Sequence, residues 1–235
     1  MTVDAPRIII TIDGPAGSGK STVSQQLAKR LGLQCLDTGA MYRSLTLLAI
    51  RESIDPQDGR ALVGALNAHT IGFDWSADPP HVLLDGQRVE DEIRGPEVAQ
   101  LVSVVSTVGQ VREAMVTAQR QIALSHRRLI SEGRDQGSVV FPDAQVRFFL
   151  SADPSTRARR RVEQLKRKGK PADLVTIEAE IMSRDSIDSS RAIGPLRCPH
   201  GAIEVDTSNL SLESVVDQLE REVRARLDSD ALASC

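Results

Sequence analysis

The earliest pattern along the chain is segment 7–12, in which apolar β-branched residues follow one another without a helical period. Such a run is typical of a strand buried on both faces, as in a parallel sheet. A glycine-rich turn follows at once. Apolar residues then recur at helical spacing over 21–31, with Gly32 where a helix cap belongs. The beginning of the chain therefore predicts a strand, a tight turn and a helix.

Further along, short apolar segments alternate with segments of helical period. They predict strands at 33–36, 129–131, 146–150 and 202–205, and helices at 40–51, 60–69, after Pro96, from about 109, at 154–168, from there to about 189, and at 212–227. Strands that alternate with helices are typical of an α/β fold with a parallel sheet and right-handed crossovers.

The middle of the chain has a different character. Three short segments of strand composition lie at 71–75, 81–84 and 87–89, and Asp85-Gly86 between the last two is a hairpin turn pair. Residues 69–95 therefore predict a small antiparallel insert in a core domain formed by 1–68 and 96–227. Segment 228–235, dominated by Ser, Asp and Ala, is predicted to be a flexible tail.

Composition excludes several functional classes. The 235 residues are 40% hydrophobic and 26% charged, and no stretch approaches the ~18 apolar residues of a membrane span. A net charge of -3 and 3% aromatic residues argue against a nucleic-acid polymer as partner. Cys35, Cys198 and Cys235 form neither a disulfide framework nor a zinc pattern, and no secretory signal is evident, so we expect a cytoplasmic protein.

Segment 14–21, Gly-Pro-Ala-Gly-Ser-Gly-Lys-Ser, fits the phosphate-binding loop pattern and lies between a predicted strand and helix. Glycines let backbone N–H groups surround a phosphate, and the helix N-terminus adds its positive end. Lys20 can neutralise the β- and γ-phosphates, and Ser21 can ligate Mg²⁺, partly through waters. A plain glycine-rich turn is the weaker alternative. The predicted ATP-binding residues are Gly14, Pro15, Ala16, Gly17, Ser18, Gly19, Lys20, Ser21 and Thr22.

The phosphate acceptor must be recognised elsewhere. The guanine-recognition sequence Asn-Lys-x-Asp is absent, and 129–132 is a poor match to the acidic pair of motor ATPases. Segments 37–43 and 132–142 instead place arginines, glycines and a carboxylate where strands end, and ligands of an open parallel sheet bind at those ends. Arginine suits phosphate and planar acceptors, although any single one is as easily a solvated surface charge.

These segments resemble those of bacterial cytidylate kinases, in the nucleoside monophosphate kinase group. The resemblance runs in order through the phosphate loop, 37–43, the insert, 111–114, 133–135 and 184–195. It implies a five-stranded parallel core, a monophosphate-binding insert, a helical lid at 155–190, and transfer of the γ-phosphate of ATP to CMP or dCMP with Mg²⁺. It also implies that Lys20, Arg43 and Arg134 are catalytic.

The resemblance further implies roles for the acceptor site. Arg43 and Arg134 would hold the acceptor phosphate; Thr38, Arg112, Asp135 and Arg191 would recognise cytosine; and Ser103, Arg184 and Asp188 would hold the sugar. Thr38 stands where serine is frequent, and the hydroxyl is retained. Segment 185–190 is less charged than is usual in these kinases, which makes Asp188 the weakest of the assignments.

Segment 157–170 carries eight basic residues and one acidic residue. Alone it indicates a solvated helix face or a nucleic-acid patch, but beside a phosphate loop it favours a lid that closes over ATP. No general base is needed, because the acceptor oxygen is already anionic, and the four histidines are interpreted as structural or exposed. Competing hypotheses are a kinase for UMP, AMP or shikimate, and an ATP-dependent switch. We expect a monomer.

Overall fold

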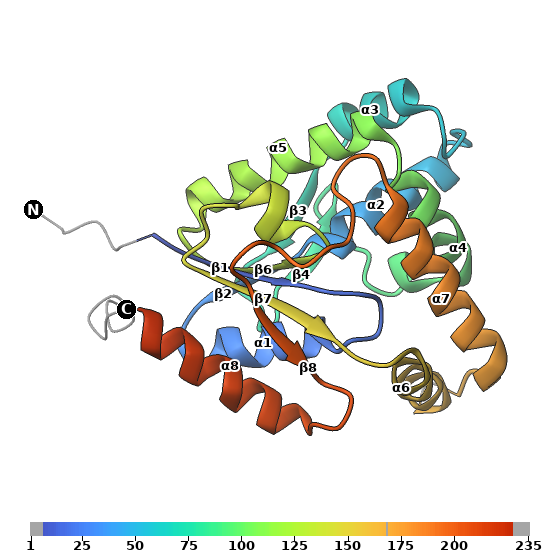
Figure 1. The fold of residues 1–235 in the computed structure, drawn as a ribbon. Coiled ribbons are helices and arrows are strands. Elements are labelled where there is room, and N and C mark those ends of the chain that lie inside the picture. Colours follow the sequence, from blue (N-terminus) through green and yellow to red (C-terminus); the bar gives the residue numbers. More distant parts are fainter. Residues whose placement is uncertain (1–6, 168, 228–235) are drawn as a thin grey trace, which may run out of the picture.

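A five-stranded parallel sheet runs through the centre of the computed structural model, which describes residues 7–167 and 169–227 (Figure 1). The strand order is β2-β6-β1-β7-β8, so the first strand is central and the chain crosses over it once, between β6 and β7. The strands are β1 (Ile8–Asp13), β2 (Gln34–Asp37), β6 (Arg128–Gly133), β7 (Val146–Ser151) and β8 (Ile203–Asp206). The predicted α/β class and parallel core are confirmed.

Helices cover both faces of this sheet. In Figure 1, α1 and α8 lie below it and α2 and α5 above it, while α3 and α4 pack on α2. The bounds are α1 (Lys20–Leu31), α2 (Thr38–Arg51), α3 (Gly59–Ala68), η1 (Glu92–Arg94), α4 (Pro96–Val105), α5 (Gly109–Ser125), α6 (Pro154–Arg167), α7 (Leu174–Ser190) and α8 (Leu212–Arg226). No helix in the described ranges has the length and apolar character needed to cross a membrane.

The isoleucine run of β1 fits the burial of this strand on both faces of the sheet. Ile8, Ile10 and Ile12 belong to the apolar cluster under α1 and α8, whereas Ile9 belongs to the cluster under α2 and α5. Successive side chains of a strand point to opposite faces, so a strand between two helical layers needs apolar residues at every position. Each such side chain contributes about 1.5–3 kcal/mol by leaving water.

Several boundaries differ by a few residues from those predicted. Helix α2 begins at Thr38 rather than at 40, because the side chain of Asp37 accepts a hydrogen bond from the backbone N–H of Ala40 at 2.9 Å and caps the helix. Strand β1 continues to Asp13, one residue beyond the isoleucine run. Both extensions bring polar residues to the carboxyl edge of the sheet.

The insert is a second, antiparallel sheet of order β3-β4-β5, formed by Ile71–Asp74, His81–Leu84 and Gln87–Arg88. Asp85 and Gly86 have positive φ of 51° and 77°, as the predicted hairpin turn requires. The ring of Trp75 stacks on that of His126 at a centroid distance of 4.0 Å. Since His126 follows α5, this stack holds the insert against the core.

Two features lie near the carboxyl end of the parallel sheet. Helices α6 and α7 form a hairpin with its own small apolar cluster, centred on Ala158, Ile177 and Ile181. A single π-helical turn, η2 (Gln136–Val140), follows β6, and the sequence did not predict it. The predicted tail, 228–235, lies outside the described residues.

Candidate active site

The phosphate loop connects β1 to α1 at the centre of the sheet edge. A Cβ on Gly14, whose φ is 150°, would overlap the carbonyl oxygen of Leu150 in β7, so only glycine lets the loop pass this strand. Lys20 is 5% exposed, and its Nζ donates to the carbonyl of Pro15 at 2.7 Å. The sequence prediction of a loop and helix N-terminus is confirmed, one residue earlier than expected.

A carboxylate that the sequence analysis set aside lies beside this loop. Glu132, near the end of β6, is 4% exposed and accepts a hydrogen bond from the Ser21 hydroxyl. Burial raises its pKa, and the nearby charge of Asp37, its register partner in β2, raises it further. Its Oε1 has no hydrogen-bond partner among the described residues. The sequence signal for Glu132 is a single acid at the end of a strand that lies next to β1, which is weaker than the acidic pair of motor ATPases.

Arginines from three separate elements meet opposite the loop. Arg43 lies on α2, Arg134 directly follows β6, and Arg184 lies on α7. Burial lowers the pKa of Arg184, and the like charges of Arg134 and Arg43 lower it further. Asp188 is the carboxylate paired with Arg134, at 2.8 Å. The carboxylates of Asp37 and Asp185 also face these arginines, yet the guanidinium groups still repel one another, and a bound anion would relieve that repulsion.

Next to the arginines is a buried planar site. Arg112, 1% exposed, forms an ion pair with Asp135 and donates to the carbonyl of Ser106 at 3.1 Å. Its guanidinium lies 5.7 Å from the ring centroid of Tyr42, a contact that sequence analysis missed. Arg112 Nε and Arg191 Nη2 have no hydrogen-bond partner within the described part of the chain. Buried donors without acceptors are costly, so this pocket fits a ligand that brings acceptors.

Gly194 closes this pocket from the segment after α7. Its φ is 58°, and an added Cβ would overlap Asp135 Oδ2 and Arg112 Nη2. Both the left-handed backbone and the lack of space require glycine here. In the sequence, the signal for this contact is weak: an isolated glycine shortly after Arg191.

The predicted acceptor residues lie close together, and Ser103 lies at the margin of this group. Asp188 is 3% exposed and lies between Arg134 and Arg191, at 3.6 Å from the latter. Thr38 Oγ1 donates to the carbonyl of Glu132 at 2.7 Å, which leaves the hydroxyl oxygen able to accept. Ser103 is buried on α4, which packs on α7, and its carbonyl accepts from the Ser106 hydroxyl.

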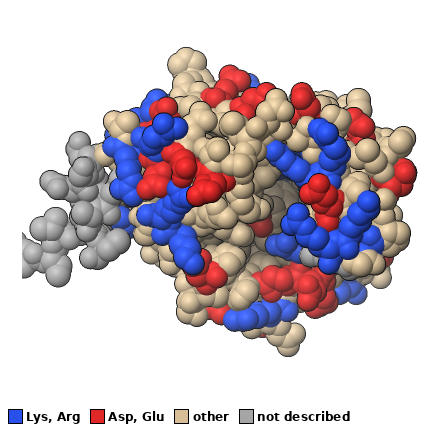
Figure 2. Space-filling model, turned by 90° about the horizontal axis from the view of Figure 1, so that it is seen from below, with Lys and Arg blue, Asp and Glu red and all other residues tan. Residues whose placement is uncertain are grey.

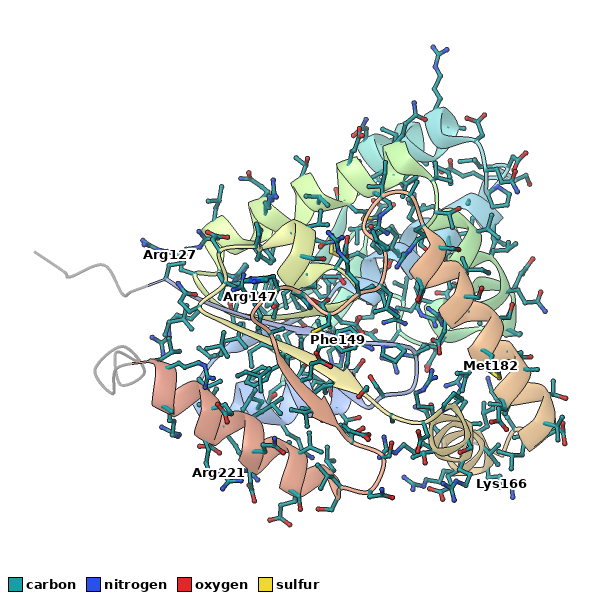
Figure 3. All side chains as sticks on the ribbon, in the orientation of Figure 1. Arg127, Arg147, Phe149, Lys166, Met182 and Arg221 are labelled. Atoms are coloured by element: carbon teal, nitrogen blue, oxygen red, sulfur yellow. The ribbon has the colours of Figure 1, made fainter. Side chains whose placement is uncertain are left out.

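The basic helix α6 uses its cations in different ways. Arg157 is buried, pairs with Asp185 of α7 at 2.6 Å, and donates to the phosphate-loop carbonyl of Ala16 at 3.0 Å. Arg160 donates to Thr207, whereas Lys166 lies on the side of α6 away from the sheet (Figure 3). Figure 2 shows a hollow in the surface seen from below, with basic side chains gathered at its right, where α6 and α7 lie in Figure 1.

The histidines lie outside this constellation, as interpreted from the sequence. His69 contacts the carboxylates of Glu52 and Asp85 at 2.6 and 2.7 Å, and His81 contacts Glu90 at 3.1 Å. His126 stacks on Trp75. None of these contacts involves a predicted site residue.

A phosphate loop that faces a second, arginine-lined anion pocket is the arrangement of a P-loop phosphotransferase with a phosphorylated acceptor. The chain belongs to the cytidylate kinase family, whose model, described as "Cytidylate kinase", matches residues 10–225. Family membership makes the chain a phosphotransferase with cytidylate kinase activity and confirms the resemblance seen in the sequence.

Curated relatives match over nearly the whole chain. The cytidylate kinase of Caldanaerobacter subterraneus subsp. tengcongensis is 47% identical over 215 residues, 92% of this chain and 94% of that protein. The cytidylate kinase of Nocardia farcinica is 43% identical over 231 residues, 97% and 98% of the two chains. Among solved structures, an uncharacterized protein from Eubacterium ventriosum aligns with a TM-score of 0.50 at 13% identity, over 94% and 99% of the chains, which shows the fold alone.

Proposed function

We propose that the chain transfers the γ-phosphate of ATP to CMP or dCMP, with the two nucleotides end to end along the carboxyl edge of the sheet. The observation that carries this proposal is the cluster of Arg43, Arg134 and Arg184 between the phosphate loop and the Arg112–Asp135 pocket. An anion would relieve the repulsion among these arginines, and a planar hydrogen-bonding group fits the pocket beyond them. A nucleoside monophosphate supplies both.

On the donor side, the backbone amides of 14–22 would surround the ATP phosphates. Lys20, buried within the loop, would exchange its contact with Pro15 for the phosphate oxygens as charge develops on them. Phosphoryl transfer requires little covalent chemistry from the protein, so position and charge neutralisation account for the rate.

The residues beside the loop fit a magnesium ion. Ser21, Glu132 and Asp37 offer hydroxyl and carboxylate oxygens, which Mg²⁺ prefers, and Glu132 Oε1 is a buried acceptor without a donor among the described residues. Ser21 would bind the ion directly and the carboxylates would hold its waters. When bound, Mg²⁺ neutralises charge on the phosphates. The sequence assigned only Ser21 to this role.

Base choice follows from the polarity of the pocket. Cytosine presents acceptors O2 and N3 beside a donating 4-amino group. Arg112 and Arg191 would supply donors, while Asp135 and the Thr38 oxygen would accept from the amine. Uracil would set a carbonyl against the Asp135 carboxylate. A buried mismatch of this kind costs about 1–3 kcal/mol or more, which is tenfold to hundredfold discrimination.

Arg43 and Arg134 would hold the acceptor phosphate, and Ser103, Arg184 and Asp188 would hold the sugar. Asp188 is already held by Arg134 and Arg191, so its proposed role includes orienting these arginines. The acceptor phosphate oxygen is anionic near neutral pH, and the reaction therefore needs no general base.

The α6–α7 hairpin would act as the lid of the predicted 155–190 region. Of the α6 arginines, Arg161 is the one that we assign to the transferring phosphoryl group. It is exposed, and its charge lies close enough to Arg43 to lower the pKa of that residue, after the larger effect of burial. Arg157, in contrast, holds the lid to the loop. Closure would also keep water from the phosphoryl group.

An ADP-release assay with CMP, dCMP, UMP, AMP and shikimate tests this proposal. We expect turnover with CMP and dCMP, at a kcat/KM at least tenfold above that for UMP. Equal or greater turnover with AMP or shikimate would overturn the acceptor assignment. ATP binding without turnover of any acceptor would favour the switch hypothesis.

We also infer a monomer in a reducing, cytoplasmic compartment. Cys35 and Cys198 are free thiols, which is usual in a reducing compartment. Light scattering after size-exclusion chromatography tests the monomer, because a dimer would double the mass of 25.5 kDa.

A further inference from the structure

Asp13 is a fully buried carboxylate that the proposed chemistry does not use. It ends β1, directly before Gly14 of the phosphate loop, and is 0% exposed. Its Oδ1 accepts from the backbone N–H of Gln136 at 2.8 Å, and its Oδ2 accepts from that of Gly137 at 2.7 Å. Both oxygens are thus bound to the first two residues of η2, 123 and 124 positions away in the sequence.

These two bonds join the donor side of the site to the acceptor side. Regular pairing of β1 with β6 ends at Asp13 and Gly133. Arg134 and Asp135 follow directly, beyond the ladder, and η2 follows them. The Asp13 carboxylate therefore connects the residue before the phosphate loop with the residues after the proposed phosphate- and base-binding pair.

The turn held in this way depends on contacts with distant residues. The N–H groups at the start of any helical turn have no partners within it, and a carboxylate satisfies them well. Arg120 of α5 donates to the carbonyls of Val139 and Val140 at the other end, at 2.9 Å each. Asp13 and Arg120 thus bind the two ends of η2.

Keeping the buried Asp13 carboxylate ionised costs free energy. Desolvation raises the pKa of Asp13 to about 6, although the two amides act against this, and the facing charges are Asp135, which raises it, and Lys20, which lowers it. Burying a carboxylate in a sheet centre adds no stability that an apolar side chain would not add. The position of the group, at the junction of the two sites, gives a reason for its presence.

We propose that Asp13 is a positioning residue that couples the two nucleotide sites, by fixing η2 so that Arg134 and Asp135 stand at the distance from the phosphate loop that in-line transfer requires. The inference rests on the roles proposed above for Arg134 and Asp135. Asp13 itself touches neither nucleotide, because both of its oxygens are occupied and the side chain has no exposed surface.

Asp13→Asn tests the coupling. The amide keeps one accepting oxygen, but its NH₂ group would face a second backbone N–H, so η2 must shift. We expect kcat to fall by about 10²-fold, as for a small misplacement of reacting groups. CMP affinity, measured by calorimetry, and the CMP/UMP ratio of kcat/KM should fall about tenfold. ATP affinity should be no weaker than in the wild type, because the loop and Lys20 are unchanged.

A merely structural role predicts a different result. It would lower the melting temperature of Asp13→Asn. Well below that temperature, the variant would keep the wild-type CMP affinity, CMP/UMP ratio and kcat, with kcat calculated from the concentration of protein that binds ATP. That outcome, or a loss of ATP affinity equal to the loss for CMP, would overturn the coupling.

Arg120→Met is a second variant, in case Asp13→Asn does not fold. Arg120 is an exposed residue, so we expect a folded protein whose CMP affinity is about threefold weaker and whose ATP affinity is unchanged. Gln121→Met, at the next exposed position of α5, is the matched control. Equal CMP affinities in the two α5 variants would overturn the proposal. Asp135→Ala distinguishes a failure of the proposed function from a failure of the coupling. If this variant keeps the wild-type CMP/UMP ratio of kcat/KM, the base-recognition role of Asp135 is wrong. If the ratio changes here but Asp13→Asn and Arg120→Met behave as the wild type, only the coupling is wrong.

Discussion

The two halves of the site are built in opposite ways. The donor half is a contiguous loop, 14–22, that uses backbone amides and one lysine between a strand and a helix. The acceptor half is assembled from α2, α4, α5, α7 and the segment after β6, and uses charged side chains that are buried or half-buried. In the proposed function, local backbone geometry recognises a phosphate on one side, and tertiary packing recognises a whole nucleotide on the other.

This contrast has an energetic consequence. A backbone loop needs few ion pairs, whereas the acceptor half keeps Arg112, Arg134 and Arg191 in place through pairs with Asp135 and Asp188. Removing one member of such a pair leaves a buried charge alone, which is costly. We therefore expect substitutions on the acceptor side to affect stability and specificity together, and those near the donor to affect rate.

Arg161→Ala should have the largest effect of these substitutions, on kcat, and it tests the donor half. If Arg161 reaches the transferring phosphoryl group on closure, kcat should fall by about 10³-fold while CMP affinity changes less than threefold. Arg159→Ala is the matched control, an exposed arginine on the same helix that donates to Thr156. Steady-state kinetics and calorimetry measure both. Equally mild effects in the two variants would make α6 a solvated helix instead.

Gly194→Ala should impair binding of CMP but not of ATP. The methyl group has no room beside Arg112 and Asp135, and φ is unfavourable, so the pocket must open. We expect the KM for CMP to rise by about 10²-fold, and the free energy of unfolding to fall by about 1–3 kcal/mol. The KM for ATP should stay within twofold. A parallel rise for both substrates would contradict the separation of the two halves.

Asp135→Ala should reduce the preference for CMP over UMP by tenfold to hundredfold, because it removes the carboxylate proposed to reject uracil. The measurement is the ratio of kcat/KM for CMP to that for UMP, together with the melting temperature, since Arg112 loses its partner. A ratio equal to that of the wild type would show that recognition of cytosine lies elsewhere in the pocket.

His69→Gln should have the smallest effect and concerns the insert. Asp85 and then Glu52 raise the pKa of His69, so the protonated ring stabilises the fold. A raised pKa in the folded state means that this contribution is complete below the ordinary value and is lost as pH rises through the raised one. Stability of the wild type, as the urea midpoint, should therefore fall more than that of the variant as pH rises above the ordinary histidine pKa of about 6.5. Parallel pH profiles would remove His69 as the cause.

The sequence predicted what local patterns determine. The β-branched run at 8–12 and the loop at 14–21 each carry their own evidence. The parallel sheet follows from the α/β alternation, and its five strands follow from the family resemblance. Acceptor residues such as Arg112 and Asp135 came from that resemblance, because nothing local distinguishes a binding arginine from a solvated one.

What escaped prediction depends on distant partners. Segment 136–140, with a glycine and two valines, has no helical pattern, and its π turn is held at its two ends by Asp13 and Arg120. Glu132 belongs to the site because β6 runs beside both β1 and β2. Gly194 matters because a chain segment folds back over Arg112. Each of these features depends on contacts between residues that are distant in the sequence, and a single sequence does not reveal such contacts.

The stack of Trp75 on His126 gives the molecule a built-in optical reporter. The chain has one tryptophan, and it lies where the insert meets the core. The indole contacts Phe73 of the insert, at a ring-centroid distance of 5.3 Å, as well as His126 of the core, so its fluorescence depends on both sides of this junction. Burial lowers the pKa of His126, which favours the neutral ring beside the indole. A change in emission when nucleotide is added would report, without any label, that the contact between insert and core has changed.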